Sequence, residues 1–174
     1  MSRGYRIAVP SFQSSATVVG SDATRIEIGL LPILGQPEMR ELLRDGLVAA
    51  GWTRTADGAS HEQDGVVAEL SADGGSVTVS ATARHEVQAS AETRAEADRR
   101  VAGHVAAGRA GATREATRKI ARVEADVRAT LEEVIQRVYV TALERKARSL
   151  GEVQSIRHGT TADGGTEVVI KVRV

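Results

Sequence analysis

The chain contains no cysteine, which excludes disulfide bonds, cysteine-ligated metal sites and a thiol nucleophile. Aromatic residues are nearly as scarce, with one Trp, one Phe and two Tyr in 174 residues. Proteins that hold single-stranded nucleic acid by base stacking need several exposed rings, so this class is excluded as well. No run of about 18 apolar residues is present, and the N-terminus lacks an apolar signal core. We therefore expect a soluble cytoplasmic protein, without a membrane partner, whose core is built from Val, Leu, Ile and Ala.

The net charge of zero hides a segregation of charge along the chain. Residues 21–80 include ten acidic residues and four arginines, a net charge of −6, whereas residues 92–149 include thirteen basic and nine acidic residues, a net charge of +4. Fields of opposite sign raise association rates, so the two halves, or two copies of the chain, could dock on each other. Exposed ion pairs contribute less than about 1 kcal/mol each, and solvated surfaces are the simpler interpretation.

Alternation of apolar and polar residues predicts two strands near the N-terminus, over residues 5–9 and 24–28. The stretch between them is rich in Ser, Thr and Gly and indicates a loop, in which residues 16–19 could form a short edge strand. Three further strands are predicted over residues 52–55, 65–70 and 76–83. Between the last two, Asp73 and Gly74 supply a positive φ at little cost and predict a hairpin turn.

A short helix is predicted after Gly35. Pro37 falls near its first position, where a missing N–H is harmless. Its apolar residues lie on one stripe, which comprises Met39, Leu42, Leu43, Leu47 and Ala50. Gly51 is typical of the residue that follows a helix end.

A long helical segment, inserted into the domain, is predicted over residues 88–150, which lack proline and are rich in Ala, Arg and Glu. The segment contains three glycines, Gly103, Gly108 and Gly111. Each costs about 1 kcal/mol relative to Ala inside a helix, so we expect a break near residues 108–112 and a helical hairpin. Thr113 would begin the second helix, whose apolar stripe runs from Ile120 to Ala142.

A closing β-hairpin is predicted from residues 152–156, a turn at residues 162–165 and a strand over residues 167–174. One face of that last strand is apolar and comprises Val168, Ile170, Val172 and Val174. The order of elements predicts an α+β fold, in which an antiparallel sheet is accompanied by one short helix and by the long helical segment before the C-terminal hairpin. We expect residues 1–174 to form a single domain.

Motifs for catalysis or for metal binding do not emerge from the sequence. The four histidines, His61, His85, His104 and His158, are not spaced as metal ligands. The sequence has no Gly-x-Ser-x-Gly elbow, and the glycines of residues 103–111 lack the preceding strand of a phosphate loop. We therefore assign no catalytic, cofactor-binding or metal-ligating residue and expect no cofactor. A protein that is not an enzyme is favoured, with an active site dispersed over Ser, His and Asp residues as the alternative.

Nucleic-acid binding is an alternative function, because residues 94–119 are rich in arginine. An exposed basic helix can neutralise phosphates without reading bases. The candidate phosphate contacts are Arg99, Arg100, Arg109, Arg114 and Arg118. The neutral total charge and the scarcity of aromatic residues argue against this function.

The C-terminal part of the chain carries a recognisable order of residues. It comprises Ile135-Gln136-Arg137-Val138-Tyr139, then Ala142 and Ala147, then Leu150-Gly151-Glu152-Val153, then Asp163-Gly164-Gly165 and a terminal strand. This pattern resembles the carboxyl end of a small uncharacterised family of cyanobacterial and chloroplast proteins, and residues 47–58 resemble it more weakly. Related small bacterial proteins are encoded beside FtsH-like or MoxR-like AAA+ ATPases and von Willebrand A domains, in ternary systems thought to act in biological conflict. The resemblance carries over no catalytic residue.

The resemblance implies a non-enzymatic accessory or adaptor subunit that binds a protein partner, with an AAA+ ATPase or its adaptor as the candidate. The helix over residues 113–150 has an apolar stripe longer than a short sheet can cover, so we expect part of it to be exposed and to bind a partner or a second copy of the chain. The centre of that contact is predicted at Val127, Leu131, Val134 and Val138.

Overall fold

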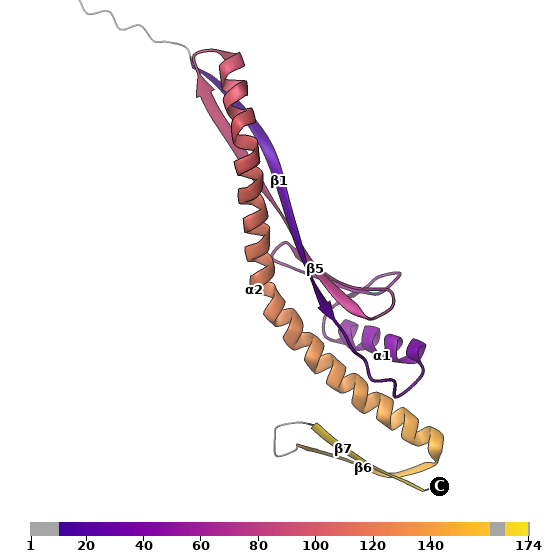
Figure 1. Cartoon of the computed structure of the whole chain (residues 1–174). Helices are drawn as coiled ribbons and strands as arrows, with labels where there is room; N and C mark the ends of the chain where they lie inside the picture. The colour runs from indigo at the N-terminus through magenta and orange to yellow at the C-terminus, as the bar shows by residue number, and fades with distance from the viewer. Residues whose placement is uncertain (1–10, 161–165, 174) are drawn as a thin grey trace, which may run out of the picture. The chain divides into compact units, whose positions relative to one another are not determined.

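The computed structural model describes residues 11–160 and 166–173. In chain order its elements are β1 (Phe12–Glu27), α1 (Gln36–Ala49), β2 (Thr53–Arg54), β3 (Ala59–Gln63), β4 (Val66–Leu70), β5 (Ser76–Ala91), α2 (Arg94–Leu150), β6 (Glu152–Thr160) and β7 (Thr166–Arg173) (Figure 1). They fall into two compact units. Unit 1 comprises the described residues up to Ala23 and Ser80–Ile120, and unit 2 comprises Thr24–Val79 and the described residues from Ala121 onward. That residues 1–174 form one domain stays a prediction.

The strands form two sheets, one with the order β1-β5-β4-β3-β2 and one that consists of β6 and β7. Three pairs have antiparallel registers, namely β2 with β3, β3 with β4 and β6 with β7. The arrows of β1 and β5 also run in opposite directions in Figure 1. The predicted α+β fold is therefore confirmed: an antiparallel sheet with a short helix, a long helical segment and a C-terminal hairpin.

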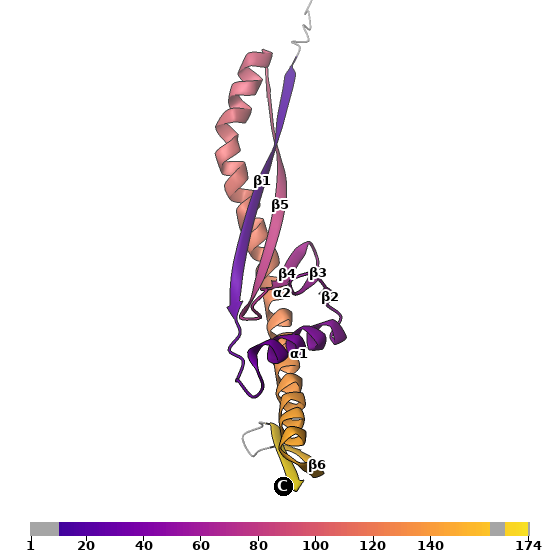
Figure 2. The same cartoon turned by 90° about the vertical axis from the view of Figure 1, so that its right-hand side faces the viewer.

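In unit 1, α2 covers one face of the ribbon formed by β1 and β5 (Figure 2). The buried residues of that face are small and comprise Val18, Gly20, Ala81, Ala83 and Ala91. The other face is exposed and mostly polar, and includes Ser15, Thr17, Thr82, Arg84 and Glu86 beside the exposed Val19. This alternation is the two-residue period of a strand with one face buried.

Within the described residues α2 is one helix of 57 residues, so the predicted break near residues 108–112 and the helical hairpin are wrong. The glycines there allow close packing against the ribbon. A Cβ atom on Gly108 would lie 2.5 Å from Val87 Cγ2, and one on Gly111 would lie 3.1 Å from His85 Nδ1. This contact with the strands offsets the cost of about 1 kcal/mol that each glycine adds inside a helix.

The strands β1 and β5 are each 16 residues long, which is longer than predicted. Most of residues 11–22, interpreted as a loop, belong to β1, because their small side chains alternate between the helix-facing and the solvent-facing side. The helical segment begins at Arg94 instead of residue 88. Residues 88–91 continue β5, where exposed Gln88 and Ser90 alternate with Ala89 and buried Ala91.

In unit 2, α1 follows Gly35 and ends before Gly51 as predicted, and four of the five residues of the predicted stripe are buried, whereas Ala50 follows the helix and is half-buried. Met39, Leu42, Leu43 and Leu47 are buried, and Gly51 follows the helix with a φ of 95°. Gly46 lets α1 approach α2, because a Cβ atom there would lie 2.8 Å from Val134 Cγ1. The core of this unit therefore includes side chains of both helices.

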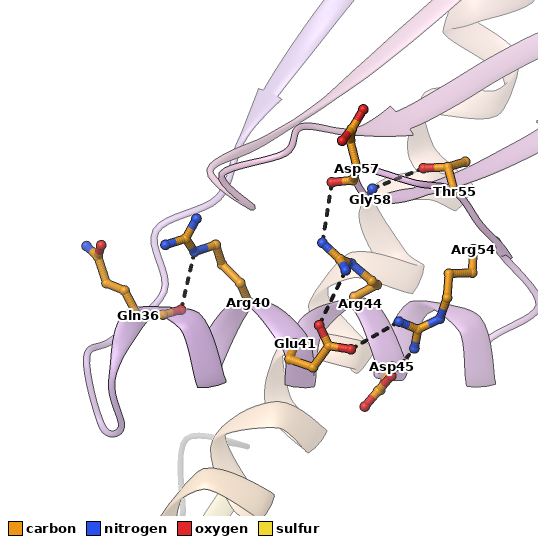
Figure 3. A network of polar contacts seen from close by, with 9 residues as sticks. All are labelled: Gln36, Arg40, Glu41, Arg44, Asp45, Arg54, Thr55, Asp57 and Gly58. Atoms are coloured by element: carbon orange, nitrogen blue, oxygen red, sulfur yellow. Dashed lines mark hydrogen bonds and ion pairs between the residues drawn. The ribbon is translucent and has the colours of Figure 1, made fainter.

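Ion pairs tie α1 to the start of the small strands (Figure 3). Arg54 of β2 pairs with Glu41 at 3.0 Å and with Asp45 of α1, and both hydrogen-bonded carboxylates raise the pKa of Arg54. Arg44 pairs with Glu41 at 3.4 Å and donates a hydrogen bond to the carbonyl oxygen of Asp57. Glu41 and Asp45, the acidic residues of α1 that face β2, therefore already have ion-pair partners.

The strand β3 was not predicted. It pairs with β4 across a tight turn in which Gln63 lies opposite Val66, and Asp64 and Gly65 have φ values of 53° and 72°. The predicted hairpin turn before β5 is confirmed, since Gly74 has a φ of 70° and Ser71 N donates to Ser76 O over 2.9 Å.

The predicted closing hairpin is confirmed as β6 paired with β7, with Ile156 opposite Ile170. Val168, Ile170 and Val172 are half-buried and alternate with exposed residues. The predicted strand over residues 5–9, the turn at residues 162–165 and Val174 lie outside the described residues.

Candidate functional site

The connection between β1 and α1, residues 28–35, is an apolar loop in unit 2 with the sequence Ile-Gly-Leu-Leu-Pro-Ile-Leu-Gly. It has neither helix nor strand structure, and Leu31 is 58% exposed. An exposed loop is normally polar, and apolar residues grouped at a surface mark interaction sites. We refer to residues 28–35 as the apolar loop and take it as the candidate site.

The backbone of the apolar loop is held by one side chain of α2. The Tyr139 hydroxyl donates to the carbonyl oxygen of Gly29 over 3.1 Å and accepts a hydrogen bond from Leu31 N over 3.2 Å. On the other side, Ile28 N donates to Gly75 O over 2.8 Å. The loop therefore has a fixed conformation at its start, which lowers the entropy lost when a partner binds.

Removing the Tyr139 hydroxyl should loosen the loop. We expect Tyr139→Phe to lower the free energy of unfolding by about 1 kcal/mol, since it leaves a backbone donor and acceptor without this partner. The Leu31 amide should exchange faster in hydrogen–deuterium exchange, and its rate should rise by a larger factor than the rates of amides in β3 and β4, which change only with the stability of the unit. An unchanged Leu31 rate would contradict the anchoring role.

A cleft of about 520 Å³ opens on one side of the apolar loop. Its walls are residues 28–32 of the loop, the first turns of α1 and the turn between β4 and β5. Asp73, at that turn, accepts hydrogen bonds from Ser71 Oγ at 2.6 Å and from Gly75 N at 2.9 Å, and these lower the pKa of Asp73. Arg40 supplies the cation in the cleft.

A second cleft, of about 470 Å³, lies against the other end of the apolar loop. It is lined by residues 32–35, by Glu38 and by Arg145, Lys146 and Ser149 from the last turns of α2. Pro32 lines both clefts. Exposed apolar residues are thus bordered by cations at each end, an arrangement suited to binding another protein.

The predicted contact residues on α2 lie elsewhere. Val127, Leu131, Val134 and Val138 are each at most 3% exposed and belong to the core of unit 2. The expectation that this part of the stripe stays exposed is therefore wrong, because side chains of the same unit cover it, as Val134 beside Gly46 illustrates. Their partner-binding role stays a prediction, and it would require α2 to leave this core.

The candidate phosphate contacts are all exposed on the first part of α2, in unit 1. Arg100 pairs with Glu96 at 2.6 Å and donates to Ser90 O, and Arg99 donates to Ala95 O within the helix. Arg114 and Arg118 lie one turn apart, and no described residue forms an ion pair with them. The structure leaves these arginines dispersed along the helix, and phosphate binding stays a prediction.

Other polar contacts of unit 1 have a structural role. His85 of β5 bonds to Glu115 of α2 at 2.7 Å, and this bond together with Lys119 lowers the pKa of Glu115. Among the described residues, no group of three or more His, Asp or Glu side chains could hold a metal ion. None of the described helices combines the length and the hydrophobicity needed to span a bilayer.

The sequence reasoning missed the apolar loop, Tyr139, Arg40, Arg145 and Lys146 as a set. A signal was present, because residues 28–34 form an apolar run broken by Gly29 and Pro32, which suits neither an alternating strand nor a helix. The cations gave no signal, since they lie more than one hundred positions apart along the chain.

Comparison with known proteins gives one finding. A model of the family described as FtsH ternary system domain X5 matches residues 1–174, the whole chain. No curated protein and no solved structure matches the chain.

Proposed function

The chain belongs to the FtsH ternary system domain X5 family, and from this we propose that it is a non-enzymatic accessory subunit that binds the AAA+ ATPase of its system. The apolar loop is the contact surface. Such a subunit would regulate the ATPase or deliver substrates to it, as part of a conflict pathway.

The observation that carries this proposal is the exposure of an apolar loop with a fixed backbone. Leu31 is 58% exposed although Gly75 holds the backbone at Ile28, and Tyr139 holds it at Gly29 and at the Leu31 amide. A preformed apolar surface bordered by cations supports protein binding, because little ordering entropy is lost and the apolar centre can be desolvated. Within the described residues no group of three or more His, Asp or Glu side chains could hold a metal ion.

The test is binding of the purified chain to the AAA+ ATPase of the same system, measured by biolayer interferometry. We expect Leu31→Asp to weaken binding about tenfold or more, because it places a charge at the centre of the contact. Val19→Asp is the matched control, since Val19 is 49% exposed and lies on β1 in unit 1. No binding of the wild-type chain at micromolar concentration would refute the proposed function, and equal losses for both variants would remove the loop from it.

A further inference from the structure

We propose that the apolar loop and its bordering cations bind a segment of the partner that carries acidic side chains on both sides of an apolar residue. This inference rests on the proposed function and adds the chemistry of the segment that is bound. It assigns Arg40 to one carboxylate, Leu31 and Pro32 to the apolar side chain, and Arg145 with Lys146 to the second carboxylate.

Arg40 is held in position and has no ion-pair partner among the described residues. Its Nε donates to Gln36 O over 3.4 Å, and its aliphatic stem lies on Gly74, where a Cβ atom would come within 2.9 Å of Arg40 Cγ. Figure 3 shows the guanidinium pointing away from the α1 ribbon, with a dashed line to the carbonyl oxygen of Gln36. No acidic side chain of the described residues pairs with it, although the carboxylate of Asp73, which accepts hydrogen bonds from Ser71 and Gly75, lines the same cleft and offsets its charge there. A preoriented guanidinium binds a carboxylate by two hydrogen bonds.

Arg145 and Lys146 provide the second positive site. Both are exposed, and neither has an ion-pair partner among the described residues. Glu38 is the acidic residue of their cleft, so the lining of this cleft keeps a net positive charge. They are also near the first residues of α1, whose N-cap Gly35 has no side-chain hydrogen bond to the helix start.

Several other basic residues of unit 2 do form ion pairs. Arg44 and Arg54 share Glu41, Arg137 pairs with Glu133 at 3.3 Å, and Arg148 pairs with Glu144 at 3.3 Å. The three cations that line the two clefts have no ion-pair partner among the described residues, and the same holds for Arg122, Arg157, Lys171 and Arg173 of this unit. At the apolar loop the unpaired cations border exposed Leu31, so charge complementarity there favours a ligand that combines acidic and apolar groups.

A single segment can reach both clefts because Pro32 lines each of them. Such a segment crosses the exposed loop at Leu31 and Pro32, where an apolar side chain buries surface that is otherwise in water. Two carboxylates and one apolar residue match these groups better than one terminal carboxylate, which would leave one positive site empty.

The experiment titrates the full chain into a short fluorescein-labelled peptide, Glu-Asp-Leu-Asp-Glu, and follows fluorescence anisotropy. A second peptide, Gln-Asn-Leu-Asn-Gln, removes the charges, and a third replaces Leu by Ser. Variants are Arg40→Glu and the double variant Arg145→Glu with Lys146→Glu. The matched control is Arg114→Glu with Arg118→Glu, which changes charge equally at exposed, unpaired arginines of unit 1.

We expect about tenfold or greater loss of peptide affinity for each site variant, for the uncharged peptide and for the Ser peptide, and no loss for the control variant. Far-UV circular dichroism checks that each variant is folded, and Arg40→Gln gives a milder change should Arg40→Glu unfold. Raising the salt concentration from about 0.1 M to about 1 M should weaken binding, because screening shortens the reach of exposed charges.

Equal losses for the control and site variants, or binding that ignores the charges of the peptide, would overturn the inference. A wild-type chain that binds the AAA+ ATPase but not the acidic peptide would also overturn it, while leaving the proposed function intact. Failure to bind the ATPase itself is the separate result that refutes the function.

Discussion

Replacing Gly20 by Ala should lower the free energy of unfolding by about 2–3 kcal/mol, although it adds a single methyl group. A Cβ atom on Gly20 would lie 2.6 Å from the carbonyl carbon of Ala112, 2.8 Å from Thr113 Oγ1 and against Thr113 N. Two of these atoms belong to the backbone of α2, which cannot move aside as a side chain end can. The helix must therefore shift away from β1 along part of unit 1.

The matched control is Gly103→Ala, which makes the same chemical change on α2. Gly103 is exposed, and a Cβ atom there would have no neighbour within 4 Å, so Ala should stabilise the helix by about 1 kcal/mol. Urea unfolding followed by far-UV circular dichroism measures both changes. Shifts of the same sign for the two variants would contradict the close packing of α2 on β1.

Leu131→Glu should destabilise unit 2 by about 4 kcal/mol, because a carboxylate would be buried without a partner. Leu131 is 3% exposed. The only Trp of the chain, Trp52, is buried in the same unit beside His61, so its fluorescence reports the unfolding. The variant should lose the native fluorescence at lower urea concentration than the wild type.

Leu143→Glu is the control on the same helix, since Leu143 is 39% exposed and should tolerate the charge within about 0.5 kcal/mol. Light scattering of each variant shows whether the apolar stripe of α2 belongs to the core of unit 2 or to an interface between copies of the chain. If Leu131→Glu kept its stability and only dissociated an oligomer, the side chain would belong to an interface, as the sequence alone suggested.

Local signals in the sequence were sufficient for several elements. Pro37 and Gly51 mark the ends of α1, and its apolar spacing gives the buried stripe. Asp73 and Gly74 mark the turn before β5. In these places the local preference of the chain and the tertiary structure agree.

Long-range packing explains what the sequence reasoning got wrong. Gly108 and Gly111 oppose a helix by their own propensity, but their missing side chains make room for Val87 and His85 of β5. The small, polar composition of residues 11–22 indicates a loop by itself, yet the same small residues let α2 approach β1. Propensity was overridden by contacts that join distant parts of the sequence.

The strand β3 was missed for a different reason. Its residues 59–63 are largely polar, and only Ala59 is buried. Asp64 and Gly65 would have predicted the hairpin with β4, since this dipeptide favours a two-residue turn. The candidate site was beyond local reasoning, because Tyr139 reaches Gly29 and Leu31 from 110 and 108 positions away.

The position of β1 at the end of the five-stranded sheet has a consequence for handling the protein. Within the described residues no strand pairs with its outer side, and over 16 residues it has three charged side chains, Asp22, Arg25 and Glu27. Backbone donors and acceptors along such an edge can recruit the same edge of another molecule. Concentrated solutions should therefore form β-rich aggregates before the protein melts, and a lysine introduced at Thr17 should delay them.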